Sequence, residues 1–323
     1  MRKKFLALAA ALILNLSPVS AEKAWELPDN GVQLYGAEKQ SYIAKTVAAA
    51  YTPQNPDNSF AAPDGWTYKT FSLGNFNLEY LENPAGKNNR VIFQLHGGGY
   101  ILALTNGHRN LAVKYGVLAD AAKIYSVDYR TAPENIYPAA LEDAVAAYQE
   151  ILKRGVDPEE IILIGDSAGG NLAVELSIYL RENNLPQPKM LILVSPWATA
   201  ENNLPSRKYN ASKDLILGKG TPLFDAVTKP SAYAKGLKAK DARISPIYAD
   251  LKKLPPMLIQ AGGYELFLDE CVELAKKAAA DDVKVTLTIY PGMSHDFALL
   301  LPNLQDSLDS FREIRDFINQ NVN

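Results

Sequence analysis

The chain has 323 residues, 47% of them hydrophobic, which is enough apolar material for one substantial core. Its 33 basic and 36 acidic residues give a net charge of −3 with no long basic run, so nucleic acid is not expected as a partner. Three scattered histidines and one cysteine leave no metal-ligand spacing and no intramolecular disulfide, and we expect neither a metal nor another cofactor.

The first 21 residues have the features of a secretory signal peptide. Basic residues at 2–4 precede an apolar run at 5–16, and the small residues Val-Ser-Ala end the segment at 19–21. The apolar run is too short to cross a bilayer, which needs about 20 residues. We therefore expect cleavage after Ala21, a periplasmic or secreted mature protein with a net charge of −6, and no stable membrane anchor.

Residues 22–68 lie outside the pattern of strands and helices that follows. A helix is predicted over 38–51, and a stretch rich in proline, asparagine and aspartate follows at 52–64. The remaining chain, 22–323, is predicted to form one domain.

The first functional motif follows a predicted buried strand at 90–95. The sequence then runs HGGGY at 96–100, with three adjacent glycines at 97, 98 and 99. Their backbone N–H groups have no Cβ to shield them, so a developing alkoxide could approach within hydrogen-bond distance. Gly97, Gly98 and Gly99 are therefore candidate oxyanion-hole residues. His108, just before a helix predicted over 110–118, is expected to be an ordinary surface or core residue.

The second motif is GDSAG at 165–169, between a run of four aliphatic residues at 161–164 and a helix with leucines at 172, 176 and 180. A buried strand, a GxSxG turn and a helix in this order predict a nucleophile elbow with Ser167 at its tip. Gly165 and Gly169 are required because a Cβ at either position would collide with the strand or the helix. The backbone N–H of Ala168 is a further candidate oxyanion donor.

A long insertion separates predicted strands at 190–194 and 256–261. It runs from about 198 to 240, and loops of this length usually carry function or structure of their own. Its apolar residues either line an acyl pocket or fix the insertion to the domain: Leu204, Leu215, Ile216, Leu217, Leu223 and Phe224.

Two carboxylates after the strand at 256–261 are candidates for the acid of a catalytic triad, since on this kind of sheet the order is nucleophile, acid, histidine. Glu265 lies on the loop, and Asp269 already begins a helix that continues to 278, where a charge favoured by the helix dipole is the alternative explanation. Glu265 is favoured and Asp269 is kept as the alternative. Cys271 is expected on the inner helix face as a small buried side chain.

His295 is the predicted general base. It follows a strand predicted over 285–290 and a Pro-Gly turn, and so lies at the carboxyl end of a strand, where α/β sheets place their chemistry. His96 belongs to the glycine loop, which leaves His295 as the histidine best placed to act on Ser167.

Five runs give the chain a resemblance to a known family. They are HGGG at 96–99, DYRTAPE at 128–134, GDSAGGN at 165–171, RISPIYADL at 243–251 and GMSHDF at 292–297. In their order and spacing the chain resembles the hormone-sensitive-lipase-like, or bacterial family IV, carboxylesterases of the α/β-hydrolase fold over roughly residues 75–320. It departs from most members where Glu265-Leu266-Phe267 replaces a run that begins with aspartate.

The resemblance implies an α/β-hydrolase fold: a mostly parallel central sheet flanked by helices, with a helical cap formed by about 22–68 and 198–240. It implies a triad of Ser167, Glu265 and His295 and the hydrolysis of short- to medium-chain carboxylic esters without a cofactor. The expected partner is a small-molecule ester, and no oligomeric state is predicted. A serine peptidase or a non-catalytic ligand-binding protein on the same fold are the alternatives, although the HGGG motif favours esters and receptors of this type lose the histidine.

Overall fold

The computed structural model describes residues 27–50 and 60–322, so the expected signal peptide lies outside the described residues. An eight-stranded sheet forms the centre of the described chain, in the order β1-β2-β4-β3-β5-β6-β7-β8. β1 and β2 pair antiparallel, as do β2 and β4, and every pair from β4–β3 to β7–β8 is parallel. The strands are β1 (Thr67–Ser72), β2 (Asn77–Glu82), β3 (Asn88–Leu95), β4 (Ala121–Asp128), β5 (Ile161–Asp166), β6 (Met190–Val194), β7 (Met257–Gly262) and β8 (Val285–Tyr290).

The parallel half of the sheet confirms the strands predicted from hydrophobic runs. β5, β6 and β7 are buried along their whole length, as expected for strands that are covered by helices on both faces. Leu95 of β3 pairs with Gly165 of β5, and Gly262 of β7 pairs with Tyr290 of β8. The register therefore brings the loops that follow these strands to one edge of the sheet. β1, β2 and β4 are additional to the predicted strands.

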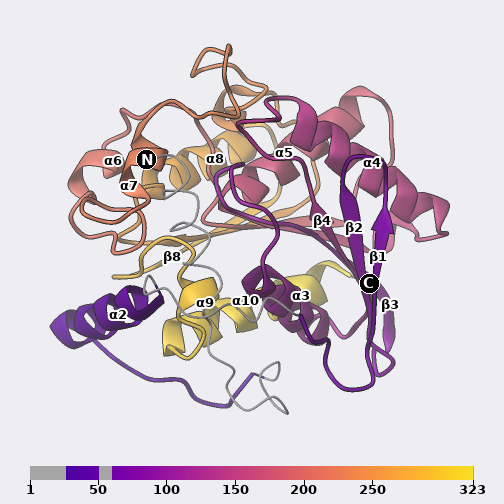
Figure 1. Cartoon of the computed structure of the whole chain (residues 1–323), viewed down its shortest axis with the longest axis horizontal. Coiled ribbons are helices and arrows are strands. Elements are labelled where there is room, and N and C mark those ends of the chain that lie inside the picture. Colours follow the sequence, from indigo (N-terminus) through magenta and orange to yellow (C-terminus); the bar gives the residue numbers. More distant parts are fainter. Residues whose placement is uncertain (1–26, 51–59, 323) are drawn as a thin grey trace.

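Helices cover the two faces of the sheet, with α4, α5 and α8 on one face and α3 and α10 on the other (Figure 1). Within the described ranges, no helix is long and apolar enough to cross a membrane. The helices are α2 (Gly36–Ala50), α3 (Asn106–Leu118), α4 (Ala139–Lys153), α5 (Ser167–Glu182), α6 (Ser206–Tyr209), α7 (Phe224–Thr228), α8 (Leu268–Ala280), α9 (Phe297–Leu300) and α10 (Gln305–Asn321), with short 3₁₀ turns at Pro158–Glu160 and Pro246–Tyr248.

Two helices begin earlier than their sequence patterns predict. α3 starts at Asn106 because Thr105 and His108 form a capping box, in which each side chain bonds the backbone of the other residue. α2 starts at Gly36 and lies beside the loop after β8. There the side chain of Gln40 donates a hydrogen bond to the carbonyl of Gly292 at 2.7 Å.

The insertion at 198–240 is less helical than expected. α6 has four residues and α7 five, and the rest of the insertion consists of turns and irregular chain. Its position beside the carboxyl ends of the parallel strands is set by side-chain contacts, which are described with the site.

Candidate active site

Ser167 lies at a strained turn between β5 and α5. Its φ of +50° is in the left-handed region, which places its side chain at the tip of a sharp strand-to-helix corner. A Cβ on Gly165 would lie 2.2 Å from the carbonyl oxygen of Gly169, and one on Gly169 would lie 2.0 Å from the carbonyl oxygen of Leu95. The predicted need for glycine at both positions is therefore confirmed.

The structure brings His295 to this serine. The imidazole Nε2 lies 3.0 Å from the Ser167 Oγ, and the Nδ1 lies 3.3 Å from the Glu265 Oε2. The three groups come from the loops after β5, β7 and β8, which the parallel register places at one sheet edge. A neutral imidazole held by a carboxylate at Nδ1 can accept the serine proton at Nε2.

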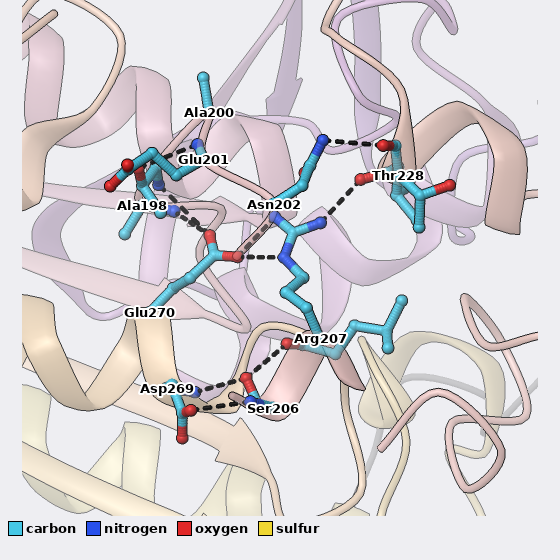
Figure 2. Close-up of polar contacts among 12 residues, drawn as sticks. Ala198, Ala200, Glu201, Asn202, Ser206, Arg207, Thr228, Asp269 and Glu270 are labelled. Carbon is cyan, nitrogen blue, oxygen red and sulfur yellow. Dashed lines mark hydrogen bonds and ion pairs between the residues drawn. The ribbon is translucent and has the colours of Figure 1, made fainter. Parts of the chain in front are cut away.

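Asp269, the alternative acid, has its hydrogen-bond partners in the insertion. Figure 2 shows its exchange of hydrogen bonds with Ser206: the Asp269 Oδ2 accepts from the Ser206 backbone N–H at 2.8 Å, and the Ser206 Oγ accepts from the Asp269 backbone N–H at 3.1 Å. The other carboxylate oxygen accepts from the Tyr209 hydroxyl at 2.8 Å. Asp269 therefore binds the insertion to α8, and the geometry favours Glu265 as the acid.

Glu265 is completely buried, and its surroundings hold the carboxylate in one orientation. Burial raises its pKa, while hydrogen bonds from His295 and from the Ser195 hydroxyl lower it. The second oxygen, Oε1, lies 3.5 Å from the Cys271 Sγ. Cys271 is buried as predicted, and it also contacts the triad carboxylate directly.

A short part of the insertion links the acid loop to the histidine loop. The Asn210 side chain donates to the backbone carbonyl of Glu265 at 2.9 Å, and the Asp214 Oδ2 accepts from the Leu266 N–H at 2.9 Å. One residue further on, the Leu215 N–H donates to the Ser294 Oγ at 3.1 Å. Residues 210–215 therefore fix the relative positions of two of the three catalytic loops.

The glycine loop divides into two parts. Gly98, Gly99 and Ala168 line the cavity that contains Ser167, as an oxyanion hole requires. Gly97 does not line this cavity. A Cβ there would lie 2.1 Å from the Asp166 Oδ2, so Gly97 packs closely against the residue that precedes Ser167.

The two other histidines are structural. The His96 ring stacks on Tyr129 with centroids 4.1 Å apart, and its Nδ1 donates to the Gly97 carbonyl at 2.7 Å, which holds the glycine loop in place. Burial lowers the pKa of His96 to about 4, and burial also lowers the pKa of His108 well below its usual value. His108 is a core residue, with its Nε2 3.8 Å from the Asp166 Oδ2.

A cavity of about 1410 Å³ opens onto Ser167 and His295. Of the six apolar insertion residues considered for an acyl pocket, Ile216, Leu217 and Leu223 line it, and the other three do not. Leu215 and Phe224 are half-buried and pack against the core. None of the described residues before 98 lines this cavity, so α2 contributes contacts to the histidine loop instead. The larger apolar lining residues are Ile101, Leu102, Ile136, Trp197, Ile216, Leu217, Leu223, Val227, Leu237, Ile244, Phe267, Leu299 and Leu300.

A buried ion pair anchors the insertion beside the site (Figure 2). The Arg207 guanidinium donates from Nε to the Glu270 Oε1 at 2.7 Å, and the Glu270 Oε2 accepts from the N–H groups of Ala198 and Thr199. Arg207 also lies over the Phe267 ring, 4.3 Å from its centroid, and the edge of this ring packs against the His295 imidazole. The anchor of the insertion therefore reaches the catalytic histidine through one aromatic side chain.

Three residues near the site had no role assigned from the sequence. The Asp296 Oδ2 lies 3.0 Å from the His295 Nε2, and the Ser195 hydroxyl contacts both Glu265 and the backbone N–H of Asp296. Asp214 joins the insertion to the acid loop. Only Asp296 carries a sequence signal, because it directly follows the predicted base. In the described part of the chain no group of three or more His, Cys, Asp and Glu residues could hold a metal ion.

The fold and the site together define a serine hydrolase: a doubly covered parallel sheet with a nucleophile, an acid and a base on the loops that follow β5, β7 and β8. Residues 92–299 match the model of a family described as having the alpha/beta hydrolase fold. The chain belongs to this family, within its hormone-sensitive-lipase-like esterases, as the resemblance predicted.

Named relatives are ester hydrolases. The chain is 33% identical to an esterase of Acinetobacter venetianus, over 71% of this chain and 74% of that protein, and 34% identical to an acetyl-hydrolase of Streptomyces hygroscopicus, over 69% and 73%. A solved esterase of the bacterial hormone-sensitive lipase family is similar with a TM-score of 0.75 and 27% identity, covering 99% of this chain and 98% of that one. The protein is thus an ester-hydrolysing serine hydrolase.

Proposed function

We propose that the protein is an exported carboxylesterase that hydrolyses short- to medium-chain carboxylic esters through an acyl-enzyme. The observation that carries this proposal is the contact of His295 with both Ser167 and Glu265, beside an apolar cavity lined by Gly98, Gly99 and Ala168.

In the proposed mechanism the Ser167 oxygen attacks the ester carbonyl while the His295 Nε2 accepts its proton. Glu265 holds the imidazole orientation and stabilises its charged form. The oxyanion receives hydrogen bonds from the Ala168 N–H and from the glycine loop at Gly98 and Gly99. The imidazolium then protonates the leaving alcohol, and a water molecule activated by His295 releases the acid and regenerates the serine.

The size of the acyl group is proposed from the cavity and the relatives. The aliphatic side chains of Leu217, Leu223 and Val227 give the cavity an apolar wall suited to an alkyl chain. One relative is named an acetyl-hydrolase, and a similar solved structure, EstE5, was soaked with p-nitrophenyl butyrate; it is 30% identical with a TM-score of 0.74 over 98% of both chains. Both names support short acyl groups.

A p-nitrophenyl ester series with acyl chains from acetyl to decanoyl, together with labelling by a fluorophosphonate, tests the proposal. We expect labelling of the purified protein and the largest kcat/KM with short- to medium-chain esters. A faster turnover of peptide substrates would favour the peptidase alternative. Saturable ligand binding without labelling or turnover would favour the non-catalytic alternative.

Export is proposed from the sequence features of residues 1–21 alone. Mass spectrometry of the protein recovered from the periplasm or the medium should give a chain that begins at Glu22. An intact Met1 terminus in exported material would contradict the cleavage.

A further inference from the structure

The Nε2 atom of His295 has two partners. It lies 3.0 Å from the Ser167 Oγ and also 3.0 Å from the Asp296 Oδ2. A neutral imidazole with its N–H directed at Glu265 has only a lone pair at Nε2, and an ionised carboxylate has only acceptors. The close approach of Nε2 and Oδ2 therefore favours a protonated Nε2, as in an imidazolium with a carboxylate beside each ring nitrogen.

The backbone fixes Asp296 in this position. Its φ is +45°, in the left-handed region, and its N–H donates to the Ser195 Oγ at 3.2 Å. The residue is 8% exposed and lines the substrate cavity, while its Oδ1 is buried without a hydrogen-bond partner among the described residues. An unpartnered carboxylate oxygen of this kind leaves the imidazole as the main partner of Asp296.

Other charged groups face His295 from each neighbouring loop. Glu265 lies at Nδ1, Asp214 approaches from the insertion and Asp166 from the elbow, and the uncharged Phe267 edge covers one side of the ring. Burial lowers the pKa of His295, but the charges and hydrogen bonds of Asp296 and Glu265 raise it by more. The pKa of His295 therefore lies well above its usual value.

We propose that Asp296 holds the Nε2 proton of His295 in the resting enzyme, and thereby sets the pH below which Ser167 has no base. This inference rests on the proposed acyl-enzyme mechanism. In acid, Nε2–H is directed at Asp296 and cannot accept the serine proton. As the pH rises, that proton is lost to solvent, and the Nε2 lone pair becomes available to the Ser167 hydroxyl. Asp296 acts through His295 and is therefore a positioning residue.

Asp296→Asn is the sharpest test because asparagine tolerates the left-handed backbone as well as aspartate does and keeps the N–H bond to Ser195. The acidic limb of kcat/KM reports the loss of the neutral base as the pH falls. Removing the carboxylate that contacts the imidazole should lower the pKa of His295 and move this limb about one pH unit lower. One pH unit below the midpoint of the wild-type limb, the variant should then keep about half of its own plateau activity, against about a tenth for the wild type. Asp282→Asn is the matched control, because Asp282 is an exposed aspartate with a left-handed backbone after α8. This variant should leave the acidic limb of kcat/KM in place.

A second measurement does not depend on turnover. The chain has three histidines, and burial lowers the pKa values of His96 and His108, whereas the carboxylates around His295 raise its pKa. In nitrogen-15 NMR of labelled histidine, the imidazole that titrates at the highest pH should therefore be that of His295. It should titrate at lower pH in Asp296→Asn and also in Asp296→Gly, which keeps the backbone conformation.

An unchanged limb together with an unchanged imidazole titration in both variants would overturn the inference, as would a lower plateau with no shift of the limb. Failure of the proposed function looks different. In that case the wild-type protein itself would neither react with a fluorophosphonate nor hydrolyse p-nitrophenyl esters, while the NMR titration would still test the contact between Asp296 and His295.

Discussion

The parallel sheet and the insertion at 198–240 hold their parts of the site by different means. Ser167 is positioned mainly by close backbone packing, since the absence of a Cβ at Gly165 and Gly169 allows strand, turn and helix to touch. The insertion has only two short helices and is held by buried polar side chains such as Arg207, which pairs with Glu270. The position of the nucleophile therefore depends on local backbone geometry. The positions of the acid, the histidine loop and the cavity wall depend on contacts between residues far apart in the sequence.

The largest expected effect tests the sheet side of this comparison. Ser167→Ala should lower kcat by about 10⁶ and abolish fluorophosphonate labelling, because the remaining oxyanion donors give only residual catalysis. Steady-state kinetics on p-nitrophenyl esters with the purified variant measure the loss. Retention of more than about a tenth of the activity would show that Ser167 is not the nucleophile.

The second prediction distinguishes the two candidate acids, Glu265 on the loop before α8 and Asp269 in its first turn. Glu265→Gln should lower kcat by about 10⁴, because the imidazole loses the partner that fixes its tautomer and its charge. Asp269→Asn should cost far less in kcat, because its carboxylate binds Ser206 and Tyr209 in the insertion. The reverse ranking in kcat would assign the triad acid to Asp269.

The third prediction concerns the buried ion pair between Arg207 and Glu270 that anchors the insertion. Arg207→Ala leaves the Glu270 carboxylate buried without its cation, which typically destabilises a protein by about 3–5 kcal/mol. Chemical denaturation with circular dichroism detection gives the free energy of unfolding. Lys276→Ala is the control on the same helix as Glu270, since its exposed pair with Glu273 is screened by water and should contribute little to stability. Equal losses in the two variants would mean that the buried pair does not hold the insertion.

The smallest effect concerns the cavity wall. Leu217 lines the cavity, whereas Leu215 and Phe224 pack against the core without lining it. Leu217→Ala should enlarge the acyl site and shift preference toward longer esters, by roughly fourfold in kcat/KM per CH₂ since each methylene contact is worth about 0.8 kcal/mol. The same measurement over acetyl to decanoyl esters should show unchanged profiles for Leu215→Ala and Phe224→Ala. Identical shifts in all three would remove the distinction between lining and packing residues.

The strand and turn that carry Ser167 could be predicted because the residues that determine them are contiguous in the sequence. The aliphatic run before Ser167 specifies a buried strand, and the glycines around it specify the sharp turn, so both are visible within ten residues. The glycine loop was less predictable. The three glycines look equivalent, yet Gly97 is turned toward Asp166, a residue 69 positions away whose place is set by strand pairing.

The insertion side could not be predicted in the same detail. Its apolar residues follow no helical or strand period, so nothing in the sequence separates Leu217, which lines the cavity, from Leu215, which does not. The direction of each side chain follows from bonds between distant residues, such as that of the Leu215 N–H to Ser294, 79 positions later. The partner of His295 at Nε2 depends in turn on the left-handed backbone of Asp296.

The close packing of Gly97 on Asp166 bears on how new specificities could arise on this scaffold. A side chain at position 97 would meet the Asp166 carboxylate at 2.1 Å, and one at 169 would meet the backbone of β3 at 2.0 Å, so any substitution there displaces both catalytic loops together. Leu217 and Leu223 of the insertion line the cavity, where a change of side chain alters its wall without such a backbone clash. Random libraries should therefore yield active variants with altered substrate range at the insertion positions and mostly inactive protein at the glycines, which makes the insertion the part of the enzyme that can evolve.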